Sequence, residues 1–132
     1  MKVKFTILAV CAGLLLVALP VLAHHSFSAE YDTSKPVTLK GKLIKMDWVN
    51  PHSWIHMAVA TPDGKVEEWG CETPPPNGLY RSGWRKNMLK EGDEITVQGY
   101  LAKDATHVMW SQSVTFADGS RLTLGSAPTG KE

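Results

Sequence analysis

Residues 37–49 read VTLKGKLIKMDWV, and the apolar residues of this run change phase halfway along it. They occupy odd positions as far as Leu43 and even positions from Ile44 to Trp48. A strand buries alternate side chains, so a change of phase requires an extra residue or a sharp bend. We therefore expect one long, curled β-strand with a bulge or bend near Gly41.

The sequence after this run predicts further strands and one short helix. The predicted strands cover residues 37–49, 53–60, 65–72, 94–101 and 107–116. The helix follows Pro74-Pro75-Pro76, with Asn77 as its cap, and separates the third strand from the fourth. This order indicates an all-β fold with one short helix, and it favours a small five-stranded OB-like Greek-key barrel. Another small β-barrel or a β-sandwich is the alternative.

The first 23 residues have the layout of a secretory signal peptide. Two lysines precede an apolar run at residues 5–19, and Val21 and Ala23 fit the −3 and −1 positions of a cleavage site. We expect cleavage after Ala23, which predicts a periplasmic protein with no membrane segment left in the mature chain. The mature chain would then begin at His24.

The mature chain divides into three expected parts. Residues 24–36 form an irregular N-terminal arm, residues 37–124 form the OB-like barrel domain, and residues 125–132 form a flexible tail. The formal charge is +1 for the whole chain and becomes −1 when Lys2 and Lys4 leave with the signal peptide. That balance argues against a nucleic-acid partner, which selects a basic surface.

The mature chain keeps one cysteine, Cys71, so it has no internal disulfide. A lone thiol in an oxidising compartment is either buried or reactive, and we expect Cys71 to be buried.

Histidines are the main candidates for metal binding. A mature N-terminal His24 offers its α-amine and ring, and His25 adds a second imidazole; such nitrogen ligands suit Cu(II). His52 could join them if the arm folds back. Copper is the only cofactor that these residues suggest, and the alternative is that both terminal histidines are simply solvated.

A second group of polar residues surrounds the turn at Asn50-Pro51. The alternation of a strand puts His52, Trp54 and His56 on one face, opposite the apolar residues of the same strand. His52 and His56 would be about 13 Å apart on a straight strand, too far to share one metal. We take Asn50, His52, Trp54 and His56 as the candidate ligand-binding edge. The alternative is that His52 bonds to the turn backbone and that Trp54 packs under the arm.

No arrangement typical of a catalytic site accompanies these residues. The serines lack a nucleophile elbow, and Glu67 and Glu68 point to opposite faces of their strand. The sequence therefore predicts a non-enzymatic periplasmic domain that binds an unknown small ligand, such as a sugar or peptide, or a periplasmic protein. The alternative is a copper-binding protein that uses the terminal histidines. A third hypothesis is an oxidative copper enzyme with an N-terminal histidine brace.

Several motifs together resemble a family of small exported bacterial proteins of unknown function. They are His24-His25-Ser26-Phe27, Glu30-Tyr31-Asp32, the run 35–41, Trp48-Val49-Asn50-Pro51-His52-Ser53-Trp54, Pro76-Asn77, Arg81-Ser82-Gly83-Trp84 and the run 89–93. The resemblance covers nearly all of residues 24–124. It implies periplasmic export and a small β-barrel, but no activity. Cys71 is not part of the family pattern.

Overall fold

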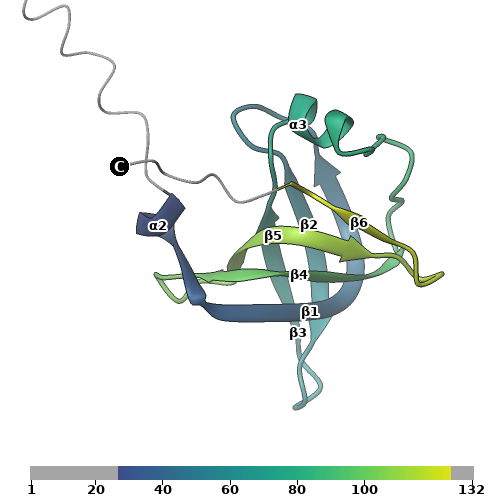
Figure 1. The fold of residues 1–132 in the computed structure, drawn as a ribbon. Helices are drawn as coiled ribbons and strands as arrows, with labels where there is room; N and C mark the ends of the chain where they lie inside the picture. The colour runs from purple at the N-terminus through teal and green to yellow at the C-terminus, as the bar shows by residue number, and fades with distance from the viewer. Residues whose placement is uncertain (1–26, 126–132) are drawn as a thin grey trace, which may run out of the picture.

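Six strands and two short helices make up the part of the chain that the computed structural model describes, residues 27–125 (Figure 1). The elements are α2 (Phe27–Glu30), β1 (Tyr31–Asp47), β2 (Trp54–Ala60), β3 (Val66–Glu72), α3 (Pro76–Arg81), β4 (Glu94–Ala102), β5 (Val108–Thr115) and β6 (Arg121–Thr123). The prediction of a mostly β protein is confirmed, with one strand and one helix more than expected. No helix within the described range is long and apolar enough to cross a membrane.

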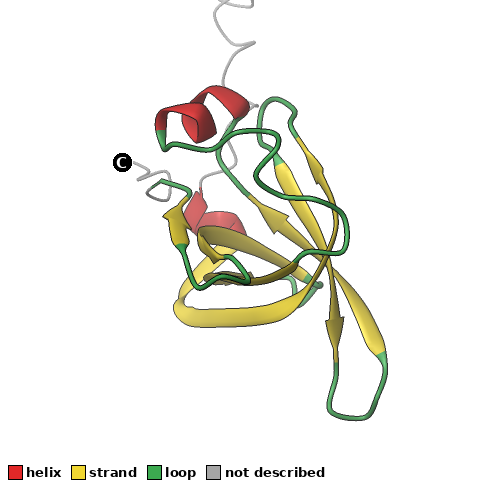
Figure 2. Ribbon diagram, turned by 90° about the vertical axis from the view of Figure 1, so that its right-hand side faces the viewer, coloured by secondary structure: helices red, strands yellow, loops and turns green. Residues whose placement is uncertain are grey.

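All six strands belong to one sheet, in the order β3-β2-β1-β4-β5-β6. Neighbouring strands are antiparallel, and a further parallel pairing joins β3 to β5 through Gly70 and Val108. The pairings therefore run in a circuit from β1 through β2, β3, β5 and β4 back to β1. The turn between β2 and β3 lies at the opposite end of the molecule from α3 (Figure 2).

The long first strand takes part in two pairings and curls between them. Its first part pairs with β4 as far as Lys42, and its last part pairs with β2 from Lys42 to Asp47. The register with β2 shifts between Leu43 and Lys45, where the apolar pattern of the sequence changes phase. A Cβ on Gly41 would lie 2.2 Å from the carbonyl oxygen of Ala58, so the curl requires glycine at this position.

The inward side of the sheet carries the core. Ile55 and Met57 of β2 are fully buried, which confirms the face predicted for this strand. Cys71 is also fully buried, as expected. The indole Nε1 of Trp84 donates a hydrogen bond to the carbonyl of Thr123 at 2.9 Å and so connects the segment after α3 to β6.

The N-terminal part of the described chain differs from the expected irregular arm. Residues 27–30 form one helical turn, and β1 starts at Tyr31, six residues before the predicted strand. Tyr31 pairs with Ala102, and the backbone N–H of Lys103 donates to the carbonyl of Glu30 at 2.8 Å. The end of β4 thus holds a segment that has no apolar alternation of its own.

Three of the predicted features lie outside the described residues. These are the signal peptide, the two terminal histidines His24 and His25, and all but the first residue of the C-terminal tail.

Candidate functional site

Glu72, the last residue of β3, lies at the centre of the candidate site. In the sheet it pairs with Trp54 on β2 and with Trp110 on β5, so the three side chains share the face opposite the core. We call this face of β2, β3 and β5 the outer face. Glu72 is nevertheless only 6% exposed, and Tyr31 at the start of β1 contacts its carboxylate on this face.

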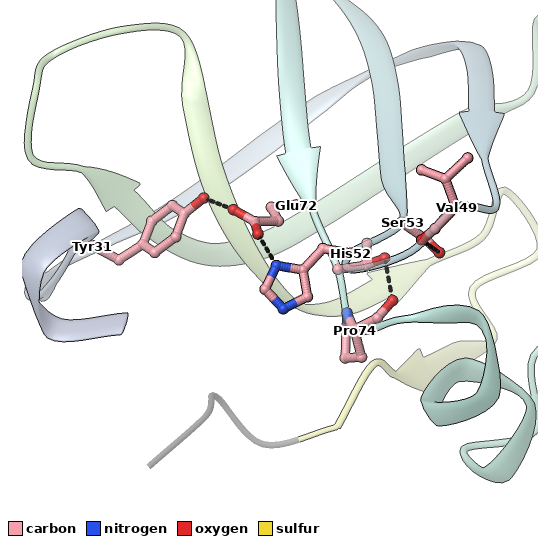
Figure 3. A network of polar contacts seen from close by, with 7 residues as sticks. Tyr31, Val49, His52, Ser53, Glu72 and Pro74 are labelled. Atoms are coloured by element: carbon pink, nitrogen blue, oxygen red, sulfur yellow. Dashed lines mark hydrogen bonds and ion pairs between the residues drawn. The ribbon is translucent and has the colours of Figure 1, made fainter. Parts of the chain in front are cut away.

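Both carboxylate oxygens of Glu72 have a hydrogen-bond partner (Figure 3). The Tyr31 hydroxyl donates to Oε2, and Nδ1 of His52 bonds to Oε1. Burial, and then the hydrogen bond to Glu72, raise the pKa of Tyr31 far above its usual value, so its phenol stays protonated at neutral pH. Two donors therefore satisfy a carboxylate that would otherwise be costly to bury.

His52 is held in place by the backbone of the loop before β2. The N–H of Thr73 donates to the carbonyl of Ser53 at 2.9 Å, and the N–H of Ser53 donates to the carbonyl of Pro74 at 3.4 Å. These bonds join the start of β2 to the chain just after Glu72. His52 therefore lies directly beside the carboxylate.

Aromatic rings pack around this polar network. Phe27 stacks on Tyr31 with ring centroids 5.3 Å apart, and it meets Trp110 edge-on at 5.5 Å. His52 also meets Trp110 edge-on, at 5.7 Å. Trp110 thus contacts both the N-terminal helical turn and the loop before β2, and it holds them together on the outer face.

A pocket of about 700 Å³ opens on the outer face beside Glu72. We call it the outer-face pocket. Its walls combine the rings of Tyr31 and Trp54 with aliphatic side chains such as Ala102 and Val108.

Charged residues form the rim of the outer-face pocket, among them Lys103 and Asp104. The hydroxyl and backbone N–H of Thr106 bond to Asp104 and lower the pKa of its carboxyl group, so this side chain is ionised at neutral pH. Lys103 Nζ donates to the carbonyl of Ser28 at 2.5 Å, which fixes the rim to the N-terminal helical turn.

The structure brings together two of the four residues predicted to bind a ligand. Trp54 lines the outer-face pocket, and His52 bonds to the carboxylate in its wall instead of to the turn backbone. Asn50 is exposed in the loop and does not line the pocket. His56 lies on the same strand face as Trp54, but its Nε2 lies 3.0 Å from Oδ2 of Asp47 on β1.

Sequence reasoning missed Glu72 and Trp110 as parts of this site, and it identified Phe27 and Tyr31 only within family motifs. The alternation of β3 shows that Glu72 points away from Cys71. Nothing local in the sequence shows that Tyr31 or His52 approaches it.

Metal ligands are sparse among residues 27–125, where no group of three His, Cys, Asp or Glu side chains could hold an ion. His107 stacks on Trp69 with centroids 4.9 Å apart, and its Nε2 lies 3.7 Å from Glu67. Burial raises the pKa of the Cys71 thiol to about 12, so this sulfur stays protonated at neutral pH.

Comparison with known proteins gives a family match. A family model described as a family of unknown function (DUF6152) matches residues 12–109, which is more than half of the chain. The matched range includes Tyr31, His52 and Glu72. No curated protein matches the chain.

Proposed function

The chain belongs to DUF6152, a family of unknown function, and we propose that it is an exported periplasmic domain that binds a small ligand in the outer-face pocket without catalysing a reaction. The observation that carries this proposal is the pocket itself, whose wall contains Trp54 and the hydrogen-bonded Glu72. Its volume of about 700 Å³ is within the usual range for small-molecule sites. A small ligand therefore fits the geometry better than a protein partner does.

The composition of the pocket favours a ligand with an apolar face and polar edges. Trp54 is half-buried and offers an indole ring, while aliphatic side chains form the rest of the wall. Rim charges such as Asp104 can orient polar groups at the pocket mouth. Sugars and short peptides combine these properties, since both present apolar surface beside hydrogen-bonding groups.

The sheet is best described as an OB-like five-stranded Greek-key barrel with β6 added at its edge. The circuit of pairings from β1 through β2, β3, β5 and β4 supports this description. Ligands of OB-like barrels commonly bind at the face of strands two and three. Trp54 and Glu72 come from these two strands and lie opposite each other in register.

The signal-like layout of residues 1–23 supports export. The cysteine and two of the histidines support a role in binding without catalysis. The Cys71 thiol is buried and protonated, which makes it a poor nucleophile. His56 and His107 each lie beside a carboxylate near the protein surface, an arrangement typical of structural contacts.

A thermal-shift screen tests the proposal. The melting temperature of the purified mature protein would be measured with a panel of mono- and disaccharides, amino acids and short peptides. A compound that binds only the folded state raises it, by an amount equivalent to about 2.7 kcal/mol at a concentration of 100 Kd. We expect Trp54→Ala to weaken binding of such a compound at least about tenfold, because truncating a buried aromatic hot spot costs about 2 kcal/mol or more.

The matched control is Trp48→Ala. Trp48 is also half-buried, but it packs against Tyr80 with centroids 5.3 Å apart and does not line the outer-face pocket. Its variant should bind the compound as the wild type does. A panel without any stabilising compound, or a compound that binds Trp54→Ala with unchanged affinity, would count against the proposal.

A further inference from the structure

We propose that the ligand of the outer-face pocket is a small organic cation, a molecule that carries a protonated amine or a quaternary ammonium group. This inference rests on the proposed function, because it names the chemical class of ligand that the same pocket takes. Two features of the pocket wall carry it: an excess of carboxylates over basic groups, and an indole ring that a ligand can reach.

The carboxylates around the pocket outnumber its basic groups. Glu30, Glu72 and Asp104 all line the pocket. Lys103 is the only basic residue among the described residues that line it. The ammonium group of Lys103 donates to the carbonyl of Ser28, so it is held against α2. A positively charged ligand is therefore attracted to this pocket, whereas an anionic ligand is repelled.

The three carboxylates act on the same part of the pocket wall. After burial and the hydrogen bond to Glu72, the negative charges of Glu72, Glu30 and Asp104 each raise the pKa of Tyr31 further. The hydroxyl of Tyr31 points toward Glu72 (Figure 3). The carboxylates come from the end of α2, the end of β3 and the turn after β4. Their negative potentials therefore overlap at the Tyr31 ring, inside the pocket.

The arrangement of these carboxylates suits an organic cation better than a metal ion. In the described part of the chain, no group of three His, Cys, Asp or Glu side chains could hold a metal ion. Both oxygens of Glu72 already bond to Tyr31 and His52, and Oδ1 of Asp104 accepts hydrogen bonds from Thr106. These carboxylates therefore attract a ligand through their charge, without coordinating it.

The indole of Trp54 provides the second feature. A Cβ on Gly70 would lie 3.5 Å from Cζ3 and 3.6 Å from Cε3 of Trp54, so the six-membered ring of the indole lies over the backbone of β3. Trp54 is half-buried and lines the pocket, so part of its side chain is open to a ligand. Tryptophan is the aromatic residue that attracts an ammonium group most strongly, and the attraction increases when the pair is shielded from water.

The test compares matched pairs of compounds that differ in charge but hardly in size. The pairs are choline and its carbon analogue dimethylbutanol, glucosamine and glucose, and benzylamine and benzyl alcohol. Titration of the purified mature protein, followed by nuclear magnetic resonance, measures the affinity for each compound at low and at high ionic strength. In each pair that binds, we expect the charged compound to bind at least about fivefold more tightly, the usual worth of a cation–π contact. Added salt should weaken binding of the charged compound only.

The key variant is Asp104→Asn, and Asp118→Asn is its matched control. Oδ1 of each aspartate accepts hydrogen bonds from the backbone N–H and the hydroxyl of the residue two positions on, which is Thr106 or Ser120. Both substitutions therefore remove one negative charge from the same kind of turn, but Asp118 does not line the outer-face pocket.

We expect Asp104→Asn to lower the affinity for the charged compound about threefold, as is usual for one charge near the surface, and Asp118→Asn to leave it unchanged. The neutral compound should bind the wild type and both variants equally, and circular dichroism checks that each variant folds. Equal effects of the two substitutions would overturn the inference.

The same titrations separate failure of this inference from failure of the proposed function. Charged and neutral compounds that bind equally well, and that both bind Trp54→Ala more weakly, would overturn the preference for a cation and leave the pocket as a binding site. A cation that binds Trp54→Ala as tightly as the wild type would contradict both proposals. Absence of binding by all three cations would also overturn the inference, whereas the proposed function is tested separately by the wider panel of compounds.

Discussion

At the scale of single residues, the candidate site depends on Glu72. Its carboxylate is almost fully buried and accepts hydrogen bonds from a tyrosine and a histidine that come from different parts of the chain. A buried charge is tolerated when its hydrogen-bonding capacity is used in this way. Each partner therefore stabilises the other two, and removal of one leaves a buried polar atom unsatisfied.

Tyr31→Phe isolates one of these contacts. The variant keeps the ring that stacks on Phe27 but removes the hydroxyl that donates to Glu72. We expect the free energy of unfolding to fall by about 1–3 kcal/mol, the usual cost of leaving a buried polar group unpaired. Urea denaturation measures this directly, and an unchanged midpoint would show that the hydrogen bond contributes nothing to stability.

The raised pKa values predict that the protein loses stability in alkaline solution. Burial raises the pKa of Cys71 to about 12 and also raises that of Tyr31, so the folded state keeps both groups protonated. In the unfolded chain they ionise near pH 8.5 and 10. Stability is therefore complete below about pH 8, and it falls as the pH rises, by up to about 1.4 kcal/mol per pH unit for the thiol.

Urea denaturation between pH 7 and 11 checks this expectation. Cys71→Ala should flatten the decline that starts near pH 8.5, and Tyr31→Phe should flatten the part above about pH 10. The comparison uses slopes, so any constant loss of stability in a variant cancels. Identical slopes in wild type and Cys71→Ala would contradict burial of the thiol as the cause.

At the scale of elements, close backbone contacts explain where the sheet needs glycine. A Cβ on Gly99 of β4 would lie 1.7 Å from the carbonyl oxygen of Trp110, whereas a Cβ on Gly70 of β3 would lie no closer than 3.5 Å to the Trp54 ring. The two glycines occupy strands of the same sheet. Of these two positions, only Gly99 has no room for a side chain.

Gly99→Ala and Gly70→Ala form a matched pair. We expect Gly99→Ala to lower the free energy of unfolding by about 3 kcal/mol or more, because backbone must move to relieve the overlap. Gly70→Ala should change it by less than about 1 kcal/mol. Chemical denaturation of the two variants measures the free energy of unfolding of each. Equal losses of this free energy would contradict the close approach of β4 to Trp110.

The elements that were predicted and those that were missed differ in one property. The strands that contain Ile55, Cys71, Val97 and Val114 alternate apolar and polar residues, and period-two alternation indicates a strand without further context. Residues 31–36 and 121–123 lack this pattern, and they are strands because they pair with β4 and β5. A pairing partner far away in the sequence cannot be identified from the local pattern.

At the scale of the whole molecule, the candidate site is assembled from distant segments. Tyr31 and Glu72 are 41 positions apart, and His52 and Glu72 are 20 apart. Alternation correctly places His52 and Trp54 away from the core, but it does not say which strand lies beside them. The parallel pairing of β3 with β5 brings Trp110 to Glu72, and the sequence carries no local sign of it.

We propose that the outer-face pocket binds a small ligand, and nuclear magnetic resonance of the five tryptophan indole N–H groups reports on that binding residue by residue. A compound from the stabilising panel should shift the Trp54 signal, identified by its loss in Trp54→Phe. The signal of Trp84 should stay in place, because this indole is buried and donates to the Thr123 carbonyl. A binding compound that shifts the Trp48 signal and leaves Trp54 unchanged would contradict the claim.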